Sequence, residues 1–170
     1  ARARGLDAAD LGIGLRDPEG DGTGGGTAGR ILPGLALWAL GLFAVSLGMK
    51  YLDEHFLQVW FTAPFAPDME AGPDWLGPLD LTFGLALVAV SEEVLSRGVF
   101  WAWLRWRGLG AAVCIPVTAA AFALTHWSDG PGNLLAALGF GLVYGLGRWR
   151  SGSVWPAVPA HFAIDYLYFS

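Results

Sequence analysis

Charged residues are scarce in this chain of 170 residues: Asp, Glu, Lys and Arg make up only 15% of it. A soluble domain of ordinary composition carries about a quarter. Hydrophobic residues form 54% of the chain and gather into long runs, and the mean hydropathy is +0.47. A soluble core does not require such runs, so we expect a lipid bilayer to surround most of the chain.

The chain also has few cysteine and basic residues. Cys114 is the only cysteine and lies in an apolar run, which excludes a disulfide framework within the chain and favours a small buried hydrophobe. The 10 Lys and Arg are outnumbered by 15 Asp and Glu, for a formal net charge of −5. This balance argues against nucleic acid as a partner.

The apolar residues divide into about five stretches. Residues 1–30 are rich in Gly, Asp and Arg without apolar periodicity, which is typical of a disordered tail. Segment 51–78 combines a short amphipathic stretch, expected at the membrane interface, with a Pro-rich loop. The predicted membrane helices span residues 31–50, 81–103, 109–127, 133–147 and 153–169. The predicted fold class is therefore an all-α integral membrane protein, a bundle of about five transmembrane helices.

The fourth stretch, 133–147, is the least regular of the five. A bilayer core of about 30 Å takes about 20 residues of helix, so tilt or local thinning would have to cover the shortfall. Gly141 and Gly145 have the G-x-x-x-G spacing that lets two helix backbones approach closely.

The basic residues predict an orientation in the membrane. Arg105 and Arg107 follow the second stretch, and Arg148 and Arg150 follow the fourth, whereas the loops after the first and third stretches are acidic apart from Lys50. Lys and Arg favour the cytoplasmic side. We therefore expect both basic turns in the cytoplasm and the C-terminus on the other side.

The second stretch carries Glu92, Glu93 and Arg97 in its middle. An ionised carboxylate near the bilayer centre costs on the order of 3 kcal/mol. Glu93 and Arg97 are four residues apart and can pair, and a structural ion pair explains these two as well as a functional role does. It does not explain Glu92, which points about 100° away from Glu93, faces a different neighbour and has no partner within its own helix.

Histidine is rare too, and two of the three histidines lie in later stretches. His126 closes the third stretch, and His161 lies in the fifth, four residues before Asp165, so that both can face one cavity. A single intramembrane histidine is commonly a hydrogen-bond partner between helices. Three helices that each bring ionisable groups into the bilayer indicate an intramembrane polar site. His55, in the mixed segment, is expected to be solvated.

These residues form three motifs that resemble those of the CPBP family of intramembrane proteases, which includes CAAX prenyl proteases and bacteriocin-processing, Abi-type proteins. The family is marked by Glu-Glu-x-x-x-Arg, Phe-x-x-x-His and His-x-x-x-Asn on successive membrane helices. This chain has, in the same order, Glu92-Glu93-x-x-x-Arg97, Phe122-x-x-x-His126 and His161-x-x-x-Asp165. The resemblance covers roughly residues 79–170, which makes this segment the expected catalytic helical core.

The resemblance implies hydrolysis of a peptide bond within the membrane, in a peptide or lipidated protein substrate. By the same resemblance, Glu92 and His126 activate a water molecule, and His161 with Asp165 stabilises the oxyanion. Donors fixed in a dry cavity stabilise an oxyanion far better than donors in water, so the assignment is physically sound. The expected location is the prokaryotic cytoplasmic membrane, and the bilayer is the other expected partner.

The remaining motif residues, Glu93, Arg97 and Phe122, are expected to support the site without reacting. Ser96 stands where the family has a bulky aromatic residue, and Asp165 replaces the usual asparagine. An aspartate donates a hydrogen bond only when protonated. These departures favour the alternative function, a non-catalytic membrane scaffold or immunity protein. A proton-coupled carrier is a third alternative, although the stretches show no inverted repeat.

A metal ion is the alternative to a metal-free reaction. Glu92, His126 and His161 would make a His₂Glu set with one open position, the arrangement of catalytic zinc. The sequence contains no H-E-x-x-H motif. The resemblance to the CAAX members also implies a glutamate-type mechanism without metal, so we favour a reaction that needs no cofactor, with zinc as the second choice.

Overall fold

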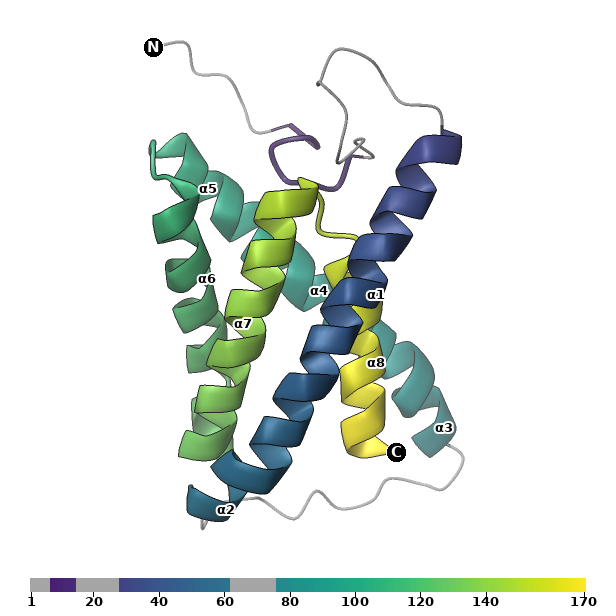
Figure 1. Cartoon of the computed structure of the whole chain (residues 1–170), viewed down its shortest axis with the longest axis vertical. Helices are drawn as coiled ribbons and strands as arrows, with labels where there is room; N and C mark the ends of the chain where they lie inside the picture. Colours follow the sequence, from purple (N-terminus) through teal and green to yellow (C-terminus); the bar gives the residue numbers. More distant parts are fainter. Residues whose placement is uncertain (1–6, 15–27, 62–75) are drawn as a thin grey trace.

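The computed structural model describes residues 7–14, 28–61 and 76–170, and every regular element in these residues is helical. The elements form five rods that run roughly along the long axis of the molecule (Figure 1). The first rod joins α1 (Ala28–Leu52), a π-helical turn (Asp53–Leu57) and α2 (Gln58–Trp60). The second joins α3 (Gly77–Leu79), a π-helical turn (Asp80–Gly84), α4 (Leu85–Glu93), a π-helical stretch (Val94–Phe100) and α5 (Trp101–Trp106).

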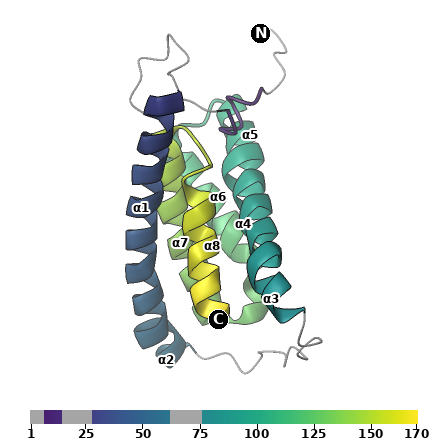
Figure 2. The same ribbon diagram turned by 90° about the vertical axis from the view of Figure 1, so that its right-hand side faces the viewer.

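The other three rods are α6 (Ala111–Thr125), α7 (Pro131–Ser151) and α8 (Ala157–Phe169), with a 3₁₀ turn (Trp127–Asp129) between α6 and α7. In the bundle α7 packs against α6 and α1, and α8 packs against α1 and α4 (Figures 1 and 2). Residues of α4, α6, α7, α8 and the end of the first rod line a cavity with both polar and apolar walls, which is where the site lies.

Two expectations about the rods are wrong. The start of segment 51–78 is not a separate interfacial helix, because residues 51–60 continue α1 and Asp53 is buried; residues 62–75 of its loop lie outside the described residues. The fourth stretch is not short, since α7 has 21 residues. Arg148 belongs to its last turn rather than to the loop after it.

Residues 7–14 form a turn that packs across the end of the bundle where α5 and α7 end (Figure 1). Hydrogen bonds to its carbonyl oxygens hold it there. Arg148 Nη2–H donates to Asp10 at 3.1 Å, the Val154 amide to Gly12 at 3.0 Å, and Trp155 Nε1–H to Ile13 at 2.9 Å. This turn differs from the disordered tail expected over residues 1–30. The other residues of that tail up to Thr27 lie outside the described residues.

The outer surface of the bundle is apolar. Large hydrophobic side chains are exposed on different rods, among them Leu37, Leu95 and Leu124. Among the described residues one helix, Leu32–Trp60, is long and apolar enough to cross a membrane, and Ala111–Thr125 is a shorter apolar helix. A soluble monomer rarely exposes so much contiguous apolar surface, so these faces need a covering.

The contact between α6 and α7 depends on glycine, as the G-x-x-x-G spacing predicts. A Cβ atom added at Gly141 would lie 2.8 Å from Ala119 Cα, and one added at Gly145 would lie 3.3 Å from Ile115 Cγ2. The first of these distances is too short for any side chain. The glycines therefore let the two backbones approach, and they bring His126, at the end of α6, beside α7.

We predict that Gly141→Ala destabilises the bundle by about 1–3 kcal/mol, because overpacking a tight contact costs that much. Gly48→Ala is the matched control, since an added methyl group there meets no atom within 4 Å. It should be neutral or stabilising by up to about 1 kcal/mol, because alanine is the better helix former. Thermal unfolding in detergent measures both, and equal melting temperatures would contradict the close contact.

Candidate active site

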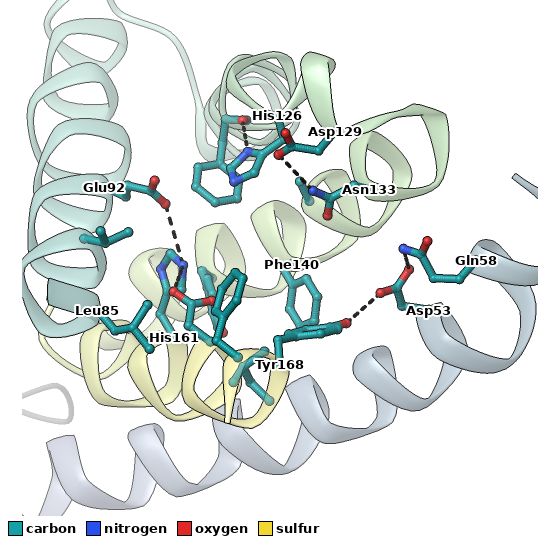
Figure 3. Close-up of a pocket in the computed structure, with 17 residues that line it drawn as sticks. Asp53, Gln58, Leu85, Glu92, His126, Asp129, Asn133, Phe140, His161 and Tyr168 are labelled. Atoms are coloured by element: carbon teal, nitrogen blue, oxygen red, sulfur yellow. Dashed lines mark hydrogen bonds and ion pairs between the residues drawn. The ribbon is translucent and has the colours of Figure 1, made fainter. Parts of the chain in front are cut away.

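The site is a cavity of about 490 Å³ between the helices (Figure 3). Glu92 of α4, His126 after α6, and His161 and Asp165 of α8 all line it. The four residues assigned to catalysis in the sequence therefore meet in one space, although they belong to three different rods. Phe122 of α6 lines the same cavity.

His161 is at the centre of the polar contacts. Its Nδ1 lies 3.0 Å from Glu93 Oε1, and because an ionised carboxylate only accepts, Nδ1–H is the donor. Its Nε2 lies 3.6 Å from Glu92 Oε2 and 3.4 Å from Asp165 Oδ2. The expectation that Glu92 and Glu93 face different neighbours is wrong, because the two adjacent glutamates contact opposite nitrogens of one imidazole ring.

Glu93 and Arg97 form the ion pair that their spacing predicts. Arg97 Nη1–H donates to Glu93 Oε1 at 3.1 Å, and both side chains are 0% exposed. The same oxygen accepts from His161, while Glu93 Oε2 and Arg97 Nε and Nη2 have no hydrogen-bond partner in the described part of the chain. The pair is thus incompletely hydrogen-bonded, and the glutamate oxygen that accepts from Arg97 also holds the imidazole ring of His161 in place.

Aromatic rings compensate part of the buried charge. The guanidinium carbon of Arg97 lies 4.4 Å from the centre of the Phe122 ring and 5.7 Å from that of Tyr144. Cation–π contacts of this kind gain strength when they are desolvated. Phe122 also contacts both histidine rings, with centroid distances of 4.9 Å to His126 and 5.9 Å to His161. The phenylalanine of the second motif therefore connects all three motifs.

His126 is the residue after the last turn of α6, where the helix ends. Its Nδ1 lies 3.1 Å from the Phe122 carbonyl oxygen, which accepts only, so Nδ1–H is the donor. The neutral ring then carries its lone pair on Nε2. The ring is half-buried and lines the cavity, so this nitrogen is the one left for chemistry.

Tyr144 of α7 is a site residue that the sequence analysis missed. It is buried, lines the cavity, and packs its ring 5.5 Å from that of His161, on the face that Glu93 and Asp165 leave free. Its hydroxyl accepts a hydrogen bond from Ser46 of α1 at 3.2 Å. A tyrosine in an apolar helix gives no pattern that distinguishes it from core residues, so no sequence signal marked it.

The zinc alternative requires Glu92, His126 and His161 to converge on one point. Within the described residues, no group of three or more His, Cys, Asp and Glu side chains is arranged to hold a metal ion. His161 instead points Nδ1 at Glu93 and Nε2 between two carboxylates. The residues do not fit a zinc site in this arrangement, so no step below is derived through a metal.

The family comparison agrees with these motifs. A family model described as type II CAAX prenyl endopeptidase Rce1-like matches residues 74–167, more than half of the chain. The chain belongs to the Rce1-like family. The predicted resemblance to CAAX proteases is thereby confirmed, and the Rce1-like proteins are membrane proteins. No curated protein and no solved structure matches the chain.

The segment matched by the Rce1-like model contains all seven motif residues, from Glu92 to Asp165. It leaves out the first rod, residues 28–60, which packs against α7 and α8 and supplies Ser46 to the site. The wall of this Rce1-like cavity therefore extends beyond the matched segment. Asp53 and Gln58 of the first rod line this cavity, and so do Tyr168 and Phe169, which follow the matched segment in α8.

We predict that Arg97→Ala lowers the stability of this Rce1-like protein by about 3–5 kcal/mol, because it leaves the Glu93 carboxylate buried without a counter-charge. The matched control is the double variant Glu93→Gln/Arg97→Met, which removes both charges and should lose much less. Thermal unfolding in detergent compares the three proteins. Full stability of Arg97→Ala with selective loss of activity would instead place Arg97 in contact with the substrate.

Proposed function

We propose that this chain is an intramembrane endopeptidase that hydrolyses a peptide bond of a membrane-associated peptide or lipidated protein, using a water molecule activated by Glu92 and His126. The observation that carries the proposal is the convergence of Glu92, His126, His161 and Asp165 on one cavity inside an apolar bundle. The Rce1-like family supports CAAX-type proteolysis as the class of reaction.

The geometry favours Glu92 over Glu93 as the general base. Glu92 lines the cavity, whereas Glu93 is fully buried behind His161 and is occupied by two donors. In the proposed reaction, Glu92 takes a proton from water while the water oxygen attacks the carbonyl carbon. His126 Nε2 accepts a hydrogen bond from the other O–H of the same water and orients it, and that proton stays on the oxygen that is added to the substrate. Glu92 then passes its proton to the leaving nitrogen as the C–N bond breaks.

We assign His161 and Asp165 to stabilisation of the oxyanion rather than to activation of the water. Glu93 and the Tyr144 ring fix the imidazole, so that Nε2 is directed at the cavity. With a proton on Nε2, His161 would donate to the oxyanion that forms on the substrate carbonyl. Asp165 lies 3.4 Å from Nε2, where an ionised carboxylate balances the charge of the imidazolium. This role does not need the donor that asparagine would supply.

Position in a membrane is part of the proposal. The exposed apolar faces of the rods match a lipid environment. At one end of the bundle, Arg105 lies in the last turn of α5, Arg107 follows it, and Arg150 lies in the last turn of α7. Asp53 and Asp129 are at the other end. The positive-inside rule places the arginine end in the cytoplasm. The cavity, lined by both of those aspartates, then opens toward the opposite side.

We predict that cysteine labelling detects this orientation. Gly110→Cys lies at the arginine end and Ser128→Cys at the aspartate end, and both positions are exposed. The native Cys114 is buried and should give no background. A membrane-impermeant maleimide added to intact cells should label position 128 and leave position 110 protected until the cells are lysed. The reverse pattern would show that the cavity opens to the cytoplasm.

We predict that Glu92→Gln and His126→Gln each abolish proteolysis while the protein still folds and inserts, because both groups act on the attacking water. Matched controls are Glu54→Gln and His55→Gln, exposed residues of the first rod that do not line the cavity. Mass spectrometry of membrane peptides from cells expressing each variant measures turnover. Peptides that depend on the protein but persist with Glu92→Gln would favour the non-catalytic scaffold that Ser96 and Asp165 left open.

A further inference from the structure

A second polar group lies in the same cavity, away from the catalytic residues, and it is built around Asp53 (Figure 3). Tyr168 OH donates to Asp53 Oδ2 at 2.7 Å, and Gln58 Nε2–H donates to Asp53 Oδ1 at 3.0 Å. Gln58 reaches Asp53 because residues 53–57 are π-helical, which brings side chains five residues apart onto the same face. The carboxylate is thus held in one orientation by two donors from two rods.

Asp53 is a buried carboxylate that forms no ion pair with a Lys, Arg or His side chain in the part of the chain that the structure describes. It is 2% exposed, and within residues 7–14, 28–61 and 76–170 both of its hydrogen-bond partners are neutral. Lys50 is the nearest candidate, but its ammonium pairs with Glu54 and lies over the Tyr168 ring, 4.1 Å from the centre. Sequence segment 62–75, which follows this end of the first rod, contains no Lys or Arg.

A buried charge without a counter-charge costs several kcal/mol, so an ionisable residue kept in that state is a candidate binding group. Here the charge is at the edge of a cavity whose rim carries a second acid, Asp129. Each carboxylate oxygen of Asp53 accepts one hydrogen bond, from Tyr168 or from Gln58, and keeps a second lone pair that can accept another. A cation that enters through the cavity would give this carboxylate a charged partner.

Apolar side chains separate the two polar groups of the cavity. Phe140 lies between Asp53 and the histidines (Figure 3), and Leu85, Val88, Ala137 and Ile164 are further apolar residues of the cavity lining. An occupant that reaches both groups must be apolar over this stretch and cationic where it meets Asp53. A peptide with a Lys or Arg side chain next to apolar residues has this chemistry, and a fully apolar or acidic peptide does not.

We propose that Asp53 is a specificity residue that binds a lysine or arginine side chain of the peptide substrate, at a fixed distance from the bond that is cut. This inference rests on the proposed function, because the occupant it names is the substrate of that reaction. The first rod, which lies outside the segment matched by the family model, would then take part in substrate recognition.

A peptide series tests the proposal. The peptides share one apolar sequence and carry Lys, Gln or Glu at a single position that is moved along it. Binding of fluorescent peptides is measured with the Glu92→Gln protein in lipid nanodiscs, and cleavage is measured separately with the wild-type chain. At one position, Lys should bind about ten-fold tighter than Gln or better, and Glu should bind weakest. Asp53→Asn, placed in the same background, should abolish most of this preference.

Asp80→Asn is the matched control, because Asp80 is an exposed acid at the same end of the bundle that does not line the cavity. It should keep the preference for Lys, which separates direct contact from the general negative field of this end. The proposal fails if no position in the peptide favours Lys over Gln, and this comparison needs no variant of Asp53. It also fails if the Asp53→Asn protein keeps the full preference for Lys. Selective binding without cleavage by the wild-type chain would contradict the proposed protease and leave the Asp53 site intact.

Discussion

The ion pair between Glu93 and Arg97 is buried where α4, α6, α7 and α8 meet, and the geometry of the site depends on it. Removing two charges from water costs several kcal/mol per ion, and this pair does not recover that cost through hydrogen bonds alone, since one glutamate oxygen serves two donors. The second donor explains the arrangement. By accepting from His161 Nδ1–H, Glu93 fixes the ring orientation, and Arg97 supplies the counter-charge to the same carboxylate oxygen.

The rods differ in what they contribute to this centre. α4 supplies the carboxylates, α8 the histidine that they hold, and α6 the second histidine, placed by the close glycine contact with α7. Phe122 lies among them and carries no charge, yet its ring contacts Arg97 and both histidines. A ring in this place excludes water from the ion pair and fills the space that two imidazoles and a guanidinium would otherwise share. The second motif therefore needs its aromatic residue as much as its histidine.

The sequence predicted the rods well because each is an apolar run, and it predicted the Glu93–Arg97 pair because four-residue spacing acts within one helix. It misjudged α7 because Arg148 looks like the end of a membrane helix, whereas its side chain is folded back onto the carbonyl oxygens of Arg97 and Asp10. The contact between Glu93 and His161 joins different helices, so no local pattern shows it. Asp53 belongs to the stretch expected at the membrane interface, and no local pattern marks it as buried. Its partner Gln58 is five residues away, a spacing that brings side chains together in a π-helical turn.

The cavity thus has two polar ends with different origins. The end with the proposed catalytic residues is made by motif residues that lie within the segment shared with the Rce1-like family, and its geometry is set by contacts among those motifs. The other end is made by the first rod together with Tyr168, the residue that follows the matched segment. At the first end, buried contacts among the motif residues fix the positions of α4, α6 and α8 relative to one another. The second end depends only on the contact between one carboxylate and its two hydrogen-bond donors. A change at Asp53 can therefore alter what the cavity accepts without moving the groups that would act on the bound chain.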